Sequence, residues 1–177
     1  MKMQIGRYNF TTVHATIAAM IFESVLLGWE YLHGGVGGHY VLQQKSLPFV
    51  SNWLGLLLLP ALTWILWSRI EKRLAEKSSA KGLSGTALLF VLGLALGVLI
   101  SVSFLNEYNF FLDNVLYIPL IISLIFPIYY SEFMLGLVVG MVTIFGVVLP
   151  TAFMLIIASV GFLIYRFIRI PILKKIR

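Results

Sequence analysis

The chain contains no cysteine and few charged residues. Without a thiol, the protein has no disulfides, iron–sulfur clusters, thiolate zinc sites or cysteine nucleophiles. Charged residues make up 11% of its 177 residues, whereas soluble domains carry about 25%. A chain that is 60% hydrophobic has too few charges to cover a water-facing surface. We therefore expect its apolar side chains to face lipid.

Several common functional motifs are also missing. The sequence holds no phosphate-binding loop, no dinucleotide fingerprint and no Ser–His–Asp order. It shows no internal repeat of the kind that many transporters carry. Its net charge of +6 does not indicate nucleic acid as a partner, because the basic residues flank apolar runs. Anionic headgroups of the lipid bilayer are the expected counter-charge.

The apolar runs predict an all-α, polytopic membrane protein of six transmembrane helices, with no separate soluble domain. A spanning helix needs about 20 apolar residues. The last run is ambiguous, because residues 133–168 hold only one charge, on Arg166. As a single helix it would be about 54 Å long, so we divide it near Pro150. The predicted spans cover about residues 11–33, 48–68, 83–105, 115–130, 133–148 and 151–168.

The basic residues predict the orientation. Lys and Arg favour the cytoplasmic side of a membrane, and twelve of the thirteen lie in three clusters. Six spans with both ends inside (N-in/C-in) put all three clusters in the cytoplasm and leave only Lys45 outside. Five spans would leave the last cluster outside. We expect a prokaryotic inner membrane. The clusters are Lys2 and Arg7; Arg69, Lys72, Arg73, Lys77 and Lys81; and Arg166, Arg169, Lys174, Lys175 and Arg177.

Small residues recur every four positions in two of the predicted spans. Gly93, Gly97 and Ser101 do so in one span, and Gly136 and Gly140 do so in another. Small residues at this spacing let helix backbones approach closely in lipid. We expect a helix contact within the chain, and the alternative is a seam in a homo- or hetero-oligomer.

The first predicted span carries a polar stripe. Glu23 and Glu30 are seven residues apart, so they lie on nearly the same face of a helix. His33 follows three residues later on a neighbouring position. Glu23 would lie near the bilayer centre, where an ionisable residue suggests a functional site. We expect Glu23 to be a deep catalytic base or a proton site.

Further polar residues are predicted to converge on the non-cytoplasmic side, around a glycine-rich loop at residues 34–38. Imidazole and carboxylate groups are suitable ligands for zinc, iron or copper. The first hypothesis is therefore a divalent metal site of a membrane enzyme acting on a lipid-soluble substrate. Its predicted ligands are Glu30, His33, His39, Glu107 and Asp113, with Tyr40, Ser51 and Asn52 as other polar site residues.

Two alternatives remain open from the sequence. The chain could be a small transporter or substrate-binding membrane subunit, with Glu23 binding a proton or cation and a hydrophobic small molecule as ligand. It could also be a structural subunit of a membrane complex, in which the polar groups bond one another.

Overall fold

The computed structural model describes residues 11–40, 46, 48–76 and 80–169. These residues form a series of helices, with one short β-hairpin between the first two. The prediction of a helical protein is confirmed. The elements are α1 (Thr12–Leu32), β1 (Gly38–Tyr40), β2 (Phe49–Ser51), η2 (Asn52–Leu54), α2 (Gly55–Glu76), α3 (Ala80–Leu105), α4 (Asn109–Asp113), α5 (Tyr117–Ile125), α6 (Ser131–Phe145), α7 (Val148–Ile164) and η3 (Tyr165–Arg169).

Within the described residues, four helices are long and apolar enough to cross a membrane. They are Thr12–Leu32, Asn52–Ala75, Gly85–Leu105 and Val148–Phe167. The second begins later than expected, because Phe49–Ser51 forms a strand, and α2 then continues to Glu76, past the predicted end at residue 68. The four helices support a membrane protein with several spans, but they do not establish the predicted six.

The fourth predicted span, residues 115–130, is much shorter in the structure. Helix α5 has 9 residues, which is about 14 Å of helix against a hydrocarbon core of about 30 Å. It ends because Pro127 follows Phe126. The residue before a proline is driven from the helical region, and Phe126 is extended with φ −112° and ψ 144°.

The predicted division of the last apolar run is present, but it lies earlier than Pro150. The chain turns after α6 at Gly146, whose φ of +64° is a left-handed conformation that glycine adopts easily. Pro150 instead lies in the first turn of α7, where its missing N–H has no helical partner to lose.

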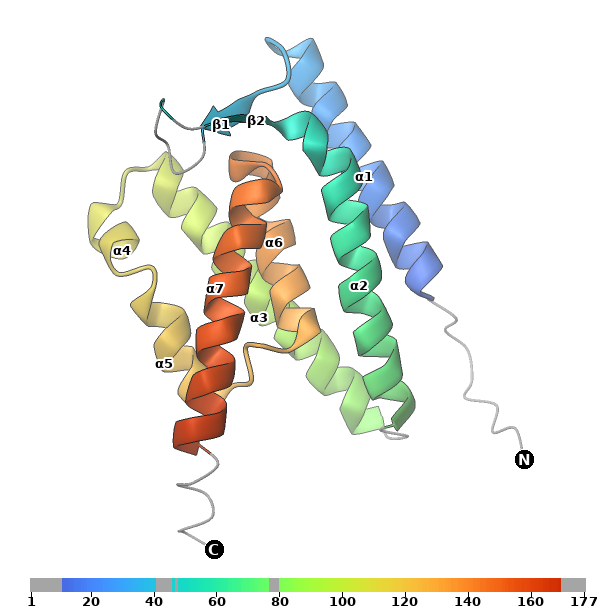
Figure 1. The fold of residues 1–177 in the computed structure, drawn as a ribbon, viewed down its shortest axis with the longest axis vertical. Helices are drawn as coiled ribbons and strands as arrows, with labels where there is room; N and C mark the ends of the chain where they lie inside the picture. The colour runs from blue at the N-terminus through green and yellow to red at the C-terminus, as the bar shows by residue number, and fades with distance from the viewer. Residues whose placement is uncertain (1–10, 41–45, 47, 77–79, 170–177) are drawn as a thin grey trace, which may run out of the picture.

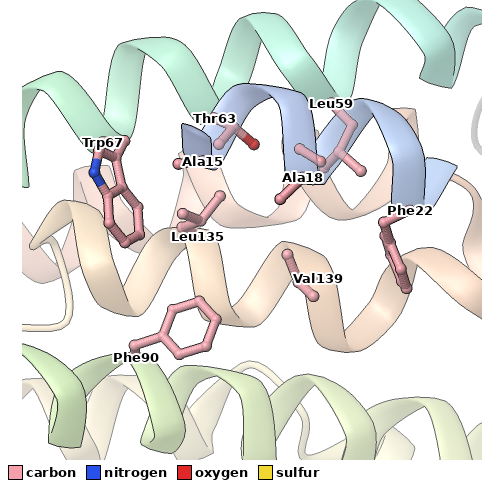
Figure 2. Close-up of a pocket in the computed structure, with 10 residues that line it drawn as sticks. Ala15, Ala18, Phe22, Leu59, Thr63, Trp67, Phe90, Leu135 and Val139 are labelled. Carbon is pink, nitrogen blue, oxygen red and sulfur yellow. The ribbon is translucent and has the colours of Figure 1, made fainter. Parts of the chain in front are cut away.

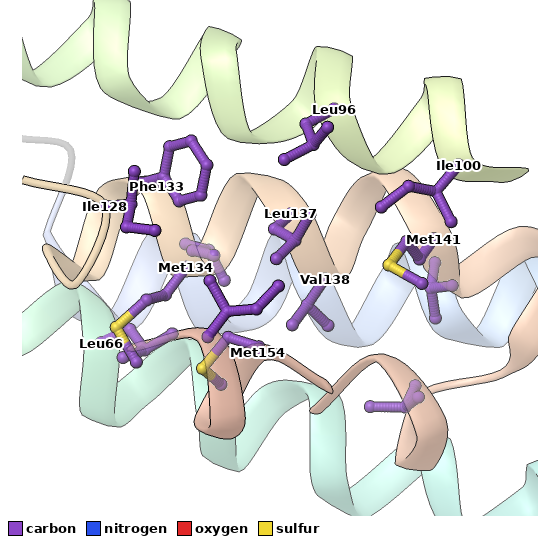
Figure 3. Packing of buried hydrophobic residues seen from close by; sticks show 14 of the residues in the cluster. Leu66, Leu96, Ile100, Ile128, Phe133, Met134, Leu137, Val138, Met141 and Met154 are labelled. Atoms are coloured by element: carbon purple, nitrogen blue, oxygen red, sulfur yellow. The ribbon is translucent and has the colours of Figure 1, made fainter. Parts of the chain in front are cut away.

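Helix α6 forms the centre of the bundle. All its residues except Val139, Thr143 and Ile144 are buried. It packs against α3, α2 and α7, and Figure 3 shows its side chains reaching toward Leu96 and Ile100 of α3 on one side. Because other helices surround it, its 15 residues do not have to match the thickness of a bilayer.

The glycine pattern predicted this central contact correctly. A Cβ added to Gly93 or Gly97 on α3 would overlap backbone carbonyl oxygens of α6, and one added to Gly136 or Gly140 on α6 would overlap those of α3. The hydroxyl of Ser101 donates to the Gly140 carbonyl oxygen at 3.1 Å. The glycine stripes therefore join α3 and α6 within the chain.

The two ends of the bundle differ. Figure 1 shows the β-hairpin beside the C-terminal end of α1 and the start of α2, with the α6–α7 turn pointing the same way. We call this the hairpin end. The opposite end carries the last turns of α2 and α7 and the first turn of α3.

Candidate functional site

A hydrogen-bonded cluster at the hairpin end is built around Glu30. The side-chain N–H groups of Asn52 donate to both carboxylate oxygens of Glu30, at 3.1 and 3.2 Å, and the backbone N–H of Gly37 donates at 3.1 Å. The Asn52 backbone N–H also donates to the Gly37 carbonyl, at 3.0 Å. The cluster thus ties the end of α1 to the hairpin and to the start of α2.

The same asparagine also contacts the α6–α7 turn. A Cβ on Gly146 would overlap the side-chain oxygen of Asn52, so the glycine allows the amide to lie against the turn. Asn52 therefore joins α1, the hairpin and the α6–α7 turn. The predicted convergence of Glu30 with Asn52 is present in the structure.

Glu23 lies deeper in the bundle. Its side chain is only 2% exposed. Its carboxyl lies directly against Gly55, the first residue of α2, and a Cβ on Gly55 would also meet Val147 at 3.0 Å. No described residue hydrogen-bonds to its Oε2 atom. Glu23 and Glu30 therefore face the neighbouring segments, and the Glu23 carboxyl lies between α1, α2 and the α6–α7 turn.

The predicted histidines do not join this cluster. His33 is exposed, stacks on Trp29 with ring centroids 3.8 Å apart, and its Nδ1 lies 2.9 Å from the Trp29 carbonyl oxygen. His39 pairs with Val50 in the hairpin, and its side chain lies outside the described part of the structure. Tyr40 is exposed and packs edge-on against Phe49, with ring centroids 5.4 Å apart.

The remaining predicted residues are spread over the hairpin end. Ser51 accepts a hydrogen bond from the Trp53 backbone N–H at 3.4 Å. Glu107 and Asp113 are exposed, and Glu107 occupies a left-handed turn with φ +53°. Among the residues that the structure describes, no three His, Asp or Glu side chains are close enough to hold a metal ion. The structure therefore does not support the predicted metal site, and metal binding stays a prediction.

An apolar cavity of about 230 Å³ that opens to the surface lies between α1, α2, α3 and α6. Helix α1 packs mainly on α2 and α3 packs mainly on α6, so the cavity forms where these two pairs meet. Figure 2 shows its walls. The lining residues are Ala15, Ala18, Ala19 and Phe22 of α1, Leu59, Thr63 and Trp67 of α2, Phe90 of α3, and Leu135 and Val139 of α6.

Thr63 places a buried hydroxyl group in this wall. Its side chain is 3% exposed, and none of the described residues hydrogen-bonds to its hydroxyl. The hydroxyls of Thr16 and Thr151 behave differently, since each donates to the carbonyl four residues earlier, at 2.8 and 2.7 Å. Thr63 lines the cavity (Figure 2), and its hydroxyl oxygen is covered by the surrounding side chains.

The opposite end carries a buried ion pair that the sequence did not predict. Arg73 of α2 pairs with Glu132 of α6, whose side chain is 1% exposed. The Arg73 guanidinium also lies 4.0 Å from the ring centroid of Tyr130. Glu132 occupies the first turn of α6, where a negative charge is favoured by the helix dipole. In the sequence, the sign of this pair was one acidic residue, Glu132, at the start of an apolar run.

The sequence did not predict the cavity, because its walls come from four helices that are apart in the chain. Thr63 is surrounded by apolar residues in the sequence, and only the packing of the four helices shows which side chains lie around it.

No protein-family model, curated protein or solved structure matches the chain.

Proposed function

We propose that the chain is a membrane protein that binds a small, lipid-soluble molecule carrying a hydrogen-bond acceptor, in the cavity between α1, α2, α3 and α6. We further propose that it crosses the membrane six times, with both ends in the cytoplasm and the hairpin end outside. The cavity carries the first proposal. Four apolar helices support a membrane location, and the distribution of basic residues supports six crossings with both ends in the cytoplasm.

The size and lining of the cavity favour an apolar occupant. An apolar cavity of about 150 Å³ engineered into a soluble protein stays dry and binds benzene, and this one measures about 230 Å³. Water is a poor occupant, because it needs two or more polar partners. A compact molecule somewhat larger than benzene fits these conditions.

The Thr63 hydroxyl distinguishes a ligand from an acyl chain of the bilayer. A hydrocarbon chain would leave this buried donor unsatisfied, which carries a free-energy penalty. A carbonyl or ether oxygen on the ligand would accept from it once the covered hydroxyl turns toward the cavity. The proposed ligand class is therefore a small aromatic or branched hydrocarbon with one such oxygen.

Trp67 provides a direct test, because it lines the cavity. The probe is 1,4-naphthoquinone, a compact molecule with carbonyl acceptors that quenches indole fluorescence. A protein that keeps only Trp67 should show saturable quenching. A protein that keeps only Trp64, which is 50% exposed, should show the linear quenching of a probe dissolved in detergent or lipid.

Three variants of the Trp67 protein complete the test. Ala19→Phe fills the cavity and should abolish saturation, whereas Ala61→Phe, on the exposed face of α2, should not. Thr63→Val should weaken binding about two- to tenfold, the value of one neutral hydrogen bond. Linear quenching in the Trp67 protein, or saturation that survives Ala19→Phe, would refute the proposal.

The absence of cysteine makes the topology testable with single cysteines at exposed positions. A membrane-impermeant maleimide applied to intact cells should label His33→Cys and Glu107→Cys. It should label Arg69→Cys and Arg166→Cys only after the membrane is permeabilised. Labelling of Arg166→Cys in intact cells, with Arg69→Cys protected, would show that the number of passes is not six.

A further inference from the structure

Because Gly55 has no side chain, it leaves the space that the Glu23 carboxyl occupies. The carboxyl lies so close to the Gly55 backbone that any Cβ there would overlap Oε1. Val147, from the α6–α7 turn, closes the same position. Three separate segments of the chain therefore enclose one carboxyl, and only glycine at residue 55 allows it to enter.

No positive charge compensates this carboxyl among the described residues. The titratable side chain that interacts electrostatically with it is Glu30, a second acid on the same helix. Gly55 and Val147, which pack against it from α2 and from the α6–α7 turn, do not titrate. An ionised carboxylate that is buried in a membrane helix without a partner is strongly disfavoured. The enclosed position suits the neutral acid.

We propose that Glu23 is a proton-binding site: the closed bundle holds the carboxylic acid, and parting of α1 from the start of α2 releases the proton. On release, the O–H bond of the acid breaks, the proton passes to water and the electron pair stays on the carboxylate. The proposal does not depend on a ligand in the cavity, because Glu23 lies one helical turn beyond Ala19, toward the hairpin end.

The Glu30–Asn52 contact controls access to this site. Glu30 lies about two turns from Glu23 on the same face, nearer the hairpin end, and it is held to Asn52 by hydrogen bonds of 3.1 and 3.2 Å. Gly55 follows Asn52 by three residues. Separation of α1 from α2 at the hairpin end must therefore break the Glu30–Asn52 contact before water reaches Glu23.

Infrared spectroscopy of the full chain in lipid nanodiscs at neutral pH tests the protonation. The wild type should show the carbonyl stretch of a protonated carboxylic acid. Glu23→Gln, which resembles the acid in shape, should lose this band, whereas Glu30→Gln should keep it. A spectrum in which Glu23→Gln removes no such band would overturn the proposal.

Two further measurements keep the test independent of that one variant. Gly55→Ala should displace the carboxyl and weaken the band, whereas Gly28→Ala, with no atom within 4 Å of the added Cβ, should keep it. In D₂O, Asn52→Ala should speed the deuterium shift of the band severalfold over the wild type. An unchanged band in Gly55→Ala, or an unchanged exchange rate in Asn52→Ala, would contradict the proposed enclosure.

Discussion

Glu71 of α2 accepts two hydrogen bonds from Thr12, the first residue of α1. The Thr12 backbone N–H donates at 2.6 Å and its hydroxyl donates at 2.8 Å. The first N–H groups of a helix have no partner within the helix, so a carboxylate from a neighbouring helix serves as the cap. Its negative charge also lies at the positive end of the α1 dipole. This contact therefore fastens the N-terminal end of α1 to α2.

Loss of this cap should destabilise the protein. Glu71→Ala should lower the free energy of unfolding by about 1 kcal/mol, the usual cost of removing a helix cap. The midpoint of thermal unfolding in detergent measures the change. Glu107→Ala, at an exposed position, should leave that midpoint within experimental error, and an equal loss in both variants would argue against the capping role.

The contact between α3 and α6 should not tolerate a methyl group. Gly97→Ala places a Cβ against the Leu137 carbonyl oxygen and 3.0 Å from the Gly140 Cα. Two backbones must then separate, and we expect a loss of about 1–3 kcal/mol, as for other overpacked cores. Gly85→Ala on the same helix meets open space and should be neutral or stabilising, because alanine favours a helix. Stabilisation by both variants would contradict the close packing.

Removal of the Arg73 side chain should leave the Glu132 carboxylate buried and unpaired. Breaking a buried ion pair on one side costs about 3–5 kcal/mol, and Arg73→Ala should show a loss in that range. The double variant Arg73→Met/Glu132→Leu should recover most of it, because no buried charge remains. Arg69→Ala, at an exposed position, is the matched control. Failure of the double variant to recover would indicate that packing, and not charge, dominates.

A carboxylate at position 52 should make the hairpin end sensitive to pH. Asn52→Asp replaces the amide that donates to Glu30 with a second acid. The introduced carboxylate donates no hydrogen bond and places a like charge beside Glu30, so stability should fall at neutral pH and should return as acid protonates the introduced group. Asn52→Leu should lose stability equally at both pH values. Unfolding midpoints at acid and neutral pH distinguish the two variants, and a pH-independent loss in Asn52→Asp would count against the contact.

The sequence predicted the features that depend on spacing along one helix. The seven-residue interval of Glu23 and Glu30 correctly placed both on the inward face of α1. The four-residue interval of glycines correctly indicated a close contact inside the chain. Both intervals follow from helix geometry alone, which is why they needed no tertiary information.

Features that depend on the ends of helices could not be predicted as well. His33 follows Glu30 at helical spacing, but it is the C-cap of α1 and turns back onto Trp29. The strand at Phe49–Ser51 pairs with Gly38–Tyr40 and takes the place of the first residues of the span predicted at 48–68. Partners such as Arg73 and Glu132 come from helices far apart in the chain, and no local pattern shows which of five basic residues meets the acid.

The burial of α6 separates two requirements that usually act on the same helix. Because its neighbours cover nearly all of its surface, α6 requires a close fit to other helices and not a particular hydrophobic length. Adjustment to a thicker or thinner bilayer, by tilting or by changes in length, therefore falls to the longer peripheral helices α1, α2, α3 and α7. Substitutions that adapt the protein to another lipid composition should accumulate on those helices and leave α6 unchanged.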